Sequence, residues 1–246
     1  MTFSDHFSAV AARYAEYRPH YPEALVATLV ERCTDHAVAW DAGCGNGQLS
    51  VALGIHFAHV IATDPAEAQL AAARPHPRVA YRRATAEVSE LPPASVDLVV
   101  AAQAAHWFDW SRYLAEVARV AKPGALVGVV SYGIGVVDGP ANAEVARFYR
   151  DDVAAYWPPG RAHVENGYRD LVWPWPAVDA PTLEMAASWT RDELVGYIST
   201  WSATSRLVAH DGPAAFDRLR SRLVVVWPGN EPRTIRWPLT IKLARR

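Results

Sequence analysis

The sequence has few cysteines, little net charge and no long apolar run. Its two cysteines, Cys33 in a helical pattern and Cys44 in a glycine-rich segment, are not placed to pair, so we expect reduced thiols. A formal net charge of -2 gives no general attraction to nucleic acid or to acidic membranes. No apolar run is long enough to cross a bilayer, and the N-terminus has no basic and apolar leader pattern. We therefore expect a soluble cytoplasmic protein with neither nucleic acid nor membrane as a partner.

What the chain does have is an alternation of apolar and amphipathic stretches. From residue 21 to residue 109 this alternation is typical of β-α-β units around a parallel sheet. The sequence predicts a doubly wound, Rossmann-like α/β fold with a seven-stranded, mostly parallel sheet and an antiparallel C-terminal strand. The expected strands are 38–41, 58–63, 79–83, 96–102, 125–131, 182–188 and 234–243. The expected helices include 110–120, 141–151, one that begins at the capping-box residue Thr190, and 213–222.

A glycine-rich turn follows the first predicted strand, with Gly43, Gly45 and Gly47 at alternate positions. Glycine permits close approach to a ligand and torsions that a Cβ forbids, although a tight packing turn would need the same residues. A dinucleotide fingerprint needs a different spacing, Gly-x-Gly-x-x-Gly. Asp41, just before the turn, disfavours a phosphate there and suits a cofactor with a cationic amino-acid end. Asp64, about twenty positions later, could bind the two ribose hydroxyls of an adenosine.

Five motifs follow one another in order along the chain. They are Val38–Gly47, Val60–Asp64, Ala84–Glu87, Val96–Trp107 and Val120–Leu126. On these motifs the sequence resembles the class I S-adenosylmethionine-dependent methyltransferases of type 11, in particular the trans-aconitate methyltransferase-like subgroup, over nearly the whole chain. The resemblance implies an enzyme with S-adenosyl-L-methionine as cofactor and S-adenosyl-L-homocysteine as product. We expect the acceptor to be a small molecule, methylated on a carboxylate or hydroxyl oxygen, although the sequence does not distinguish O-, N- and C-methylation.

The resemblance also assigns cofactor contacts. Asp41 and the turn glycines would hold the methionine part, Asp64 the ribose, and the segment of Ala86 and Glu87 the adenine edge. Gln103 would lie at the sheet edge where open α/β folds collect ligands. Arg18 could pair with the methionine carboxylate, within an N-terminal lid that includes Phe7 and residues 14–22. The predicted cofactor-binding residues are Arg18, Asp41, Gly43, Gly45, Gly47, Asp64, Ala86, Glu87 and Gln103.

His106 is the candidate catalytic residue, because histidine can accept a proton near neutral pH. We hypothesise that it orients or deprotonates the acceptor, while capping a helix or lining the pocket is the alternative. No carboxylate cluster suggests a metal site, so none is predicted. Tryptophans after Gly139 predict a pocket for a partly apolar acceptor, unless they fill the core. An acidic acceptor could be bound there by Arg147, Arg150, Arg161 and Arg169, unless water solvates them.

The expected organisation is a single methyltransferase domain, residues 1–246. Its parts are a lid and first helix (1–36), a cofactor-binding core (37–138), an insertion that caps the substrate (139–180) and a C-terminal part that completes the sheet (181–246). Two rival functions stay open: a non-catalytic S-adenosylmethionine-binding protein and, disfavoured by the glycine spacing and Asp41, a nicotinamide-dependent oxidoreductase. The sequence does not determine the oligomeric state.

Overall fold

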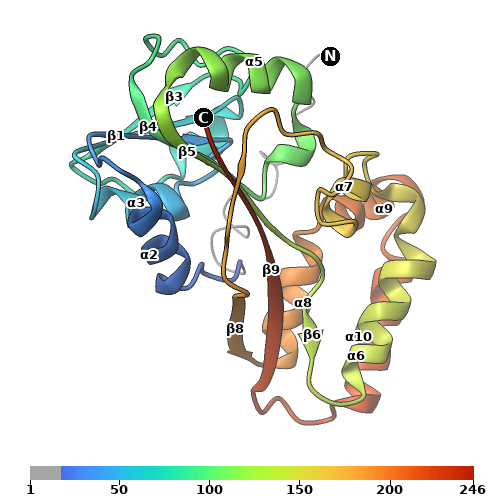
Figure 1. The fold of residues 1–246 in the computed structure, drawn as a ribbon. Coiled ribbons are helices and arrows are strands. Elements are labelled where there is room, and N and C mark those ends of the chain that lie inside the picture. Colours follow the sequence, from blue (N-terminus) through green and yellow to red (C-terminus); the bar gives the residue numbers. More distant parts are fainter. Residues whose placement is uncertain (1–17) are drawn as a thin grey trace.

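A twisted sheet runs through residues 18–246, the part of the chain that the computed structural model describes (Figure 1). Its first half is parallel, in the order β3-β2-β1-β4-β5. Both faces of these strands are covered, which explains why β4 is an almost continuous apolar run. The parallel strands are β1 (Val38–Ala42), β2 (His59–Asp64), β3 (Val79–Arg83), β4 (Val96–Ala102) and β5 (Ala121–Tyr132).

Successive side chains of β1 enter different cores, because a strand alternates its side chains between two faces. Ala39 packs in a core with Leu29 of α2 and Leu53 of α3, whereas Trp40 packs in the opposite core with Tyr113 of α5. Asp109 caps the N-terminus of α5 by accepting a hydrogen bond from the Arg112 backbone N–H at 3.2 Å. The helices around the parallel strands are α2 (Glu23–Arg32), α3 (Gln48–Gly54), α4 (Glu67–Ala71), the 3-10 helix η2 (Ala105–Trp107) and α5 (Trp110–Val120).

The second half of the sheet is built on β9 (Arg233–Arg245), which pairs antiparallel with β5. Figure 1 shows β9 as a long strand that runs from the helical layer back to the parallel strands. The predicted α/β fold with an antiparallel C-terminal strand is thus confirmed. The described sheet has nine strands rather than seven, because two-residue strands carry no periodic signal in sequence. The strands that pair with β9 are β6 (Val136–Val137), β7 (Ala177–Val178) and β8 (Glu184–Trp189).

A helical layer packs on this second half of the sheet. Its core includes Phe148, Trp201, Trp227 and Trp237, all nearly inaccessible to water, so several tryptophans fill the core. The capping box at Thr190 is confirmed, because its side chain and that of Glu193 each bind the other's backbone N–H. The helices are α6 (Ala141–Arg147), the π-helical turn η3 (Phe148–Asp152), the 3-10 helix η4 (Ala154–Tyr156), α7 (Arg161–Glu165), α8 (Arg191–Ser199), α9 (Ser202–Asp211) and α10 (Ala214–Val226).

Two sequence predictions concern features that the fold leaves open. Phe7 and residues 14–17 of the predicted lid lie outside the described residues, and the four-part organisation of the domain stays a prediction. Across residues 18–246, no helix combines the length and the apolar character that a membrane span requires.

Candidate active site

A crevice of about 820 Å³ opens where β1, β2 and β4 end. The carboxyl ends of parallel strands meet at one edge of the sheet, which is where open α/β folds bind ligands. Nine of the ten predicted site residues line this crevice, although they come from distant parts of the sequence. They are Arg18, Asp41, Gly43, Gly45, Asp64, Ala86, Glu87, Gln103 and His106.

Asp41 is the most deeply buried acid of the crevice, only 1% exposed. The Ser50 hydroxyl donates to its Oδ2 at 2.6 Å, whereas its Oδ1, also buried, accepts no hydrogen bond from any described residue. Burial raises the pKa of Asp41 to about 7; the Ser50 hydrogen bond opposes this rise and the nearby Asp64 carboxylate adds to it. A buried oxygen without a donor is costly, so this corner of the crevice suits a cationic donor.

Asp64 organises the glycine turn. Its Oδ2 accepts a hydrogen bond from the Gly45 N–H at 2.9 Å, and its Oδ1 accepts one from the Ala66 N–H at 2.8 Å. Gly43, with φ +71°, approaches the crevice wall so closely that a Cβ would lie 2.5 Å from the Ala104 Cβ. The carboxylate at the end of β2 therefore holds the turn in the shape that the crevice requires.

Gly47 is the predicted site residue that does not line the crevice. It is the N-cap of α3, with φ +79°, and a Cβ there would lie 2.1 Å from the Tyr81 hydroxyl. Its predicted cofactor contact stays a prediction, and its left-handed backbone beside Tyr81 gives it a structural role as well. The alternating spacing could not distinguish the two, since both need a left-handed glycine.

Gln103 binds β5 through both the nitrogen and the oxygen of its side-chain amide. Its Nε2 donates to the Tyr132 carbonyl and its Oε1 accepts from the Tyr132 N–H, both at 3.0 Å. Gln103 itself has φ +54°, unusual for a residue with a side chain. The Gln103 backbone N–H donates to the Val130 carbonyl at 2.7 Å, so the contacts that Gln103 can offer a ligand are its second amide N–H and its backbone carbonyl.

The predicted adenine segment also lies in the wall. Ala86 is buried, and Glu87 Oε1 accepts a hydrogen bond from the Asp109 N–H at 2.9 Å. Gln69 of α4 lines the same crevice with a buried Oε1 that has no donor among the described residues. Gln69 could not be predicted from the sequence, since a glutamine in a short helix carries no distinguishing signal.

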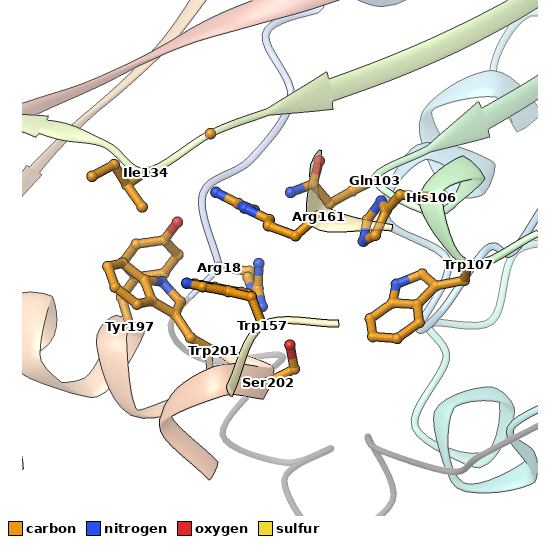
Figure 2. Close-up of a pocket in the computed structure, with 11 residues that line it drawn as sticks. Arg18, Gln103, His106, Trp107, Ile134, Trp157, Arg161, Tyr197, Trp201 and Ser202 are labelled. Atoms are coloured by element: carbon orange, nitrogen blue, oxygen red, sulfur yellow. The ribbon is translucent and has the colours of Figure 1, made fainter. Parts of the chain in front are cut away.

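A smaller alcove of about 50 Å³ adjoins the crevice, and Arg18, Gln103, His106 and Trp107 line both. In Figure 2, Arg18 and Arg161 lie between the Tyr197 and Trp201 rings on one side and Trp107 with His106 on the other. Arg18 donates to the Tyr132 hydroxyl at 3.3 Å and to the Thr200 carbonyl at 3.4 Å. The alcove therefore joins the N-terminal segment, the parallel strands and the helical layer. No cluster of three or more potential metal ligands occurs within residues 18–246.

Comparisons with known proteins agree with this architecture. A methyltransferase-domain family model matches residues 40–129. A candidate methyltransferase from Dictyostelium discoideum is 30% identical over 210 residues, 84% of this chain and 80% of that protein. The solved structure of a candidate type II methyltransferase from Anaeromyxobacter dehalogenans is 44% identical, with a TM-score of 0.85, and the match covers 93% of this chain and 98% of that one. The chain belongs to the class I S-adenosylmethionine-dependent methyltransferases.

A Saccharomyces cerevisiae protein described as an S-adenosylmethionine-dependent methyltransferase is 31% identical over 120 residues, 45% of this chain and 41% of that protein. These matches confirm that the chain is an enzyme of the methyltransferase class. They do not name an acceptor for it.

His106 of this methyltransferase stands at the junction of crevice and alcove. Its Nδ1 lies 3.2 Å from the hydroxyl of Tyr168, a buried residue with φ +55°. Tyr168 could not be predicted from the sequence, because the Asn-Gly dipeptide before it indicates only a turn. Burial, followed by the positive charge of Arg161, lowers the pKa of His106 to about 3. These surroundings favour a neutral imidazole that orients the acceptor over one that takes its proton.

An NMR titration tests this preference. We expect the ring resonance of His106, identified by its loss in His106→Gln, to show no titration between pH 5 and pH 8. Arg161→Met should raise the pKa of His106, because it removes a neighbouring positive charge, while Arg169→Met, on an exposed residue, should not. A midpoint between pH 6 and pH 7 in the wild type would instead restore the general-base hypothesis.

Proposed function

We propose that this methyltransferase binds S-adenosyl-L-methionine in the crevice, methylates a carboxylate or hydroxyl oxygen of a small molecule and releases S-adenosyl-L-homocysteine. The observation that carries the proposal is the buried, undonated Oδ1 of Asp41 in the crevice wall. An amino-acid ammonium group is the donor that such an atom lacks. The cofactor supplies an electrophilic methyl group when bound, so the protein mainly has to align the two reactants and exclude water.

The remaining contacts follow from the crevice lining. Asp64 anchors the turn through both of its carboxylate oxygens, and the same carboxylate, at the end of β2, would bind the ribose hydroxyls. Ala86 and Glu87 would border the adenine, and the Gln103 backbone would close the methionine end. Arg18 would pair with the methionine carboxylate, consistent with its position between crevice and alcove.

The identity of the acceptor does not follow from membership of the family and is proposed separately. We place the enzyme in the trans-aconitate methyltransferase-like subgroup, working on a small molecule in the cytoplasm, with no metal and no nucleic acid as substrate. The support for a small, partly apolar acceptor is the adjoining alcove, which is lined by the aromatic side chains of Trp107, Trp157, Tyr197 and Trp201. Membership of the methyltransferase family disfavours both rival functions, the non-catalytic S-adenosylmethionine-binding protein and the nicotinamide-dependent oxidoreductase.

Ligand-induced stabilisation tests the cofactor. S-adenosyl-L-homocysteine at about 100 times its Kd should stabilise the fold by about 2.7 kcal/mol, whereas NADH should leave the melting temperature unchanged. Transfer of a labelled methyl group to a panel of small acids, phenols and alcohols then tests catalysis. Failure to bind S-adenosyl-L-homocysteine would overturn the proposal, and binding without transfer to any acceptor would favour the non-catalytic alternative.

A further inference from the structure

We infer that the alcove binds a carboxylate of the acceptor that is not itself methylated, so that the substrate is an organic acid with a second, reacting oxygen group. The inference rests on the proposed function. It starts from the uneven charge of the site: the acids Asp41, Asp64 and Glu87 line the crevice, whereas among residues 18–246 no acid lines the alcove. Arg161 supplies a positive charge there, and Arg18 a second one at the boundary with the crevice. An anion is the complement of such a lining.

Arg161 is the centre of the alcove. It begins α7 and is only 8% exposed, which is unusual for an arginine. Its guanidinium lies over the Trp157 ring, 4.5 Å from the ring centroid, and its Nε donates to the Tyr149 hydroxyl at 2.9 Å. These contacts fix the plane of the guanidinium without using its outer nitrogens.

The outer nitrogens of Arg161 are available to a ligand. The Glu165 carboxylate lies 3.9 Å away on the Nε side and is itself half-exposed. Neither Nη1 nor Nη2 of Arg161 donates a hydrogen bond to another residue between 18 and 246. A planar, fixed guanidinium with two unused N–H edges is suited to bidentate contact with a carboxylate.

Trp157 supports the same ligand independently. It lines the alcove, and its Nε1 is buried without an acceptor in the described part of the chain. An indole N–H can only donate, so the group that completes this wall must accept. A carboxylate accepts through both oxygens and would satisfy Trp157 and Arg161 together.

The size of the alcove separates the bound carboxylate from the methylated atom. A volume of about 50 Å³ holds a carboxylate-sized group but not the body of a substrate, which must extend past His106 and Trp107 into the crevice. A carboxylate held in this way has its lone pairs engaged and is a poor nucleophile. The reacting oxygen is therefore a second group on the crevice side.

Calorimetry with simple acids tests this inference. With the wild type saturated with S-adenosyl-L-homocysteine, we expect benzoate or hexanoate to bind with an affinity that falls as salt rises, and the neutral isosteres benzamide and hexanamide not to bind. Arg161→Met should weaken binding of the acid by about 10- to 100-fold. The matched control Arg169→Met, on an exposed arginine eight positions later, should leave it unchanged.

The outcomes separate this inference from the proposed function. If S-adenosyl-L-homocysteine binds but neither acid does, or if the amides bind as well as the acids, the alcove is not a carboxylate site while the methyl donor site stands. If Arg161→Met fails to fold, Arg161→Lys and Trp157→Phe replace it. Each of these variants removes part of the hydrogen-bond donors of the alcove and should weaken binding of the acid several-fold. Unchanged affinity in both would overturn the inference.

Discussion

Replacing Gly43 by alanine is expected to destabilise the methyltransferase by about 2–5 kcal/mol, the sum of left-handed backbone strain and overpacking. Gly43 has φ +71°, and the added Cβ would lie 2.5 Å from the Ala104 Cβ and 3.1 Å from the Phe108 ring. Both neighbours belong to the crevice lining, and Gly43 also donates its N–H to the Thr63 carbonyl at 2.8 Å. The turn cannot relax without leaving that hydrogen bond, so affinity for S-adenosyl-L-homocysteine should fall at least about 10-fold as well.

Gly124→Ala is the matched control for this prediction. Gly124 also has a left-handed backbone, φ +82°, but a Cβ there would meet no atom within 4 Å. The free energy of unfolding of Gly124→Ala should therefore fall by only about 1–2 kcal/mol, because of backbone strain alone, and its cofactor affinity should be unchanged. Urea unfolding and calorimetry of the two variants separate clash from strain. Equal losses of stability in both, with equal affinities, would show that the contact with Ala104 is unimportant.

The parallel half of the fold was predictable because its physical rules are local. Strands 79–83 and 96–102 and the helix 110–120 occur at the predicted residues, since a doubly covered strand must be apolar and a helix needs a cap such as Asp109. The helix α9 was missed, because the segment that starts it has no side-chain cap and mixes small and polar residues. Its existence depends on tertiary packing around Trp201.

The candidate site divides in the same way. Asp41, Asp64 and Gln103 could be predicted to line the crevice because each lies within, or directly after, the last two residues of a parallel strand. Arg161 could not be singled out among four arginines, since only folding shows that it is buried while Arg150 and Arg169 are exposed. The alcove draws on Arg18, His106 and Trp157, which are separated by dozens of residues in sequence, and no local pattern records that proximity.

Replacing Asp41 by asparagine should weaken binding of S-adenosyl-L-homocysteine by at least about 100-fold, because it removes the charge that pairs with a buried ammonium group. The same variant should gain stability without ligand at high pH. The pKa of Asp41 is about 7 in the fold and near 3.9 when unfolded, so the folded state binds the extra proton between those values. The stability that this proton confers is present below pH 4 and lost as pH rises through 7, a difference on the order of 4 kcal/mol.

In urea unfolding without ligand, the free energy of unfolding of Asp41→Asn should therefore rise relative to that of the wild type between pH 4 and pH 8. The control Asp217→Asn, on the exposed side of α10, should keep the same difference from the wild type at every pH. Cofactor binding reverses the preference of Asp41, because an ammonium partner favours its ionised form. Near pH 6 the wild type should release up to one proton per S-adenosyl-L-homocysteine bound, measured by calorimetry in buffers of different ionisation enthalpy, and Asp41→Asn should release none. If wild type and Asp41→Asn release the same number of protons, the buried carboxylate does not receive the amino group.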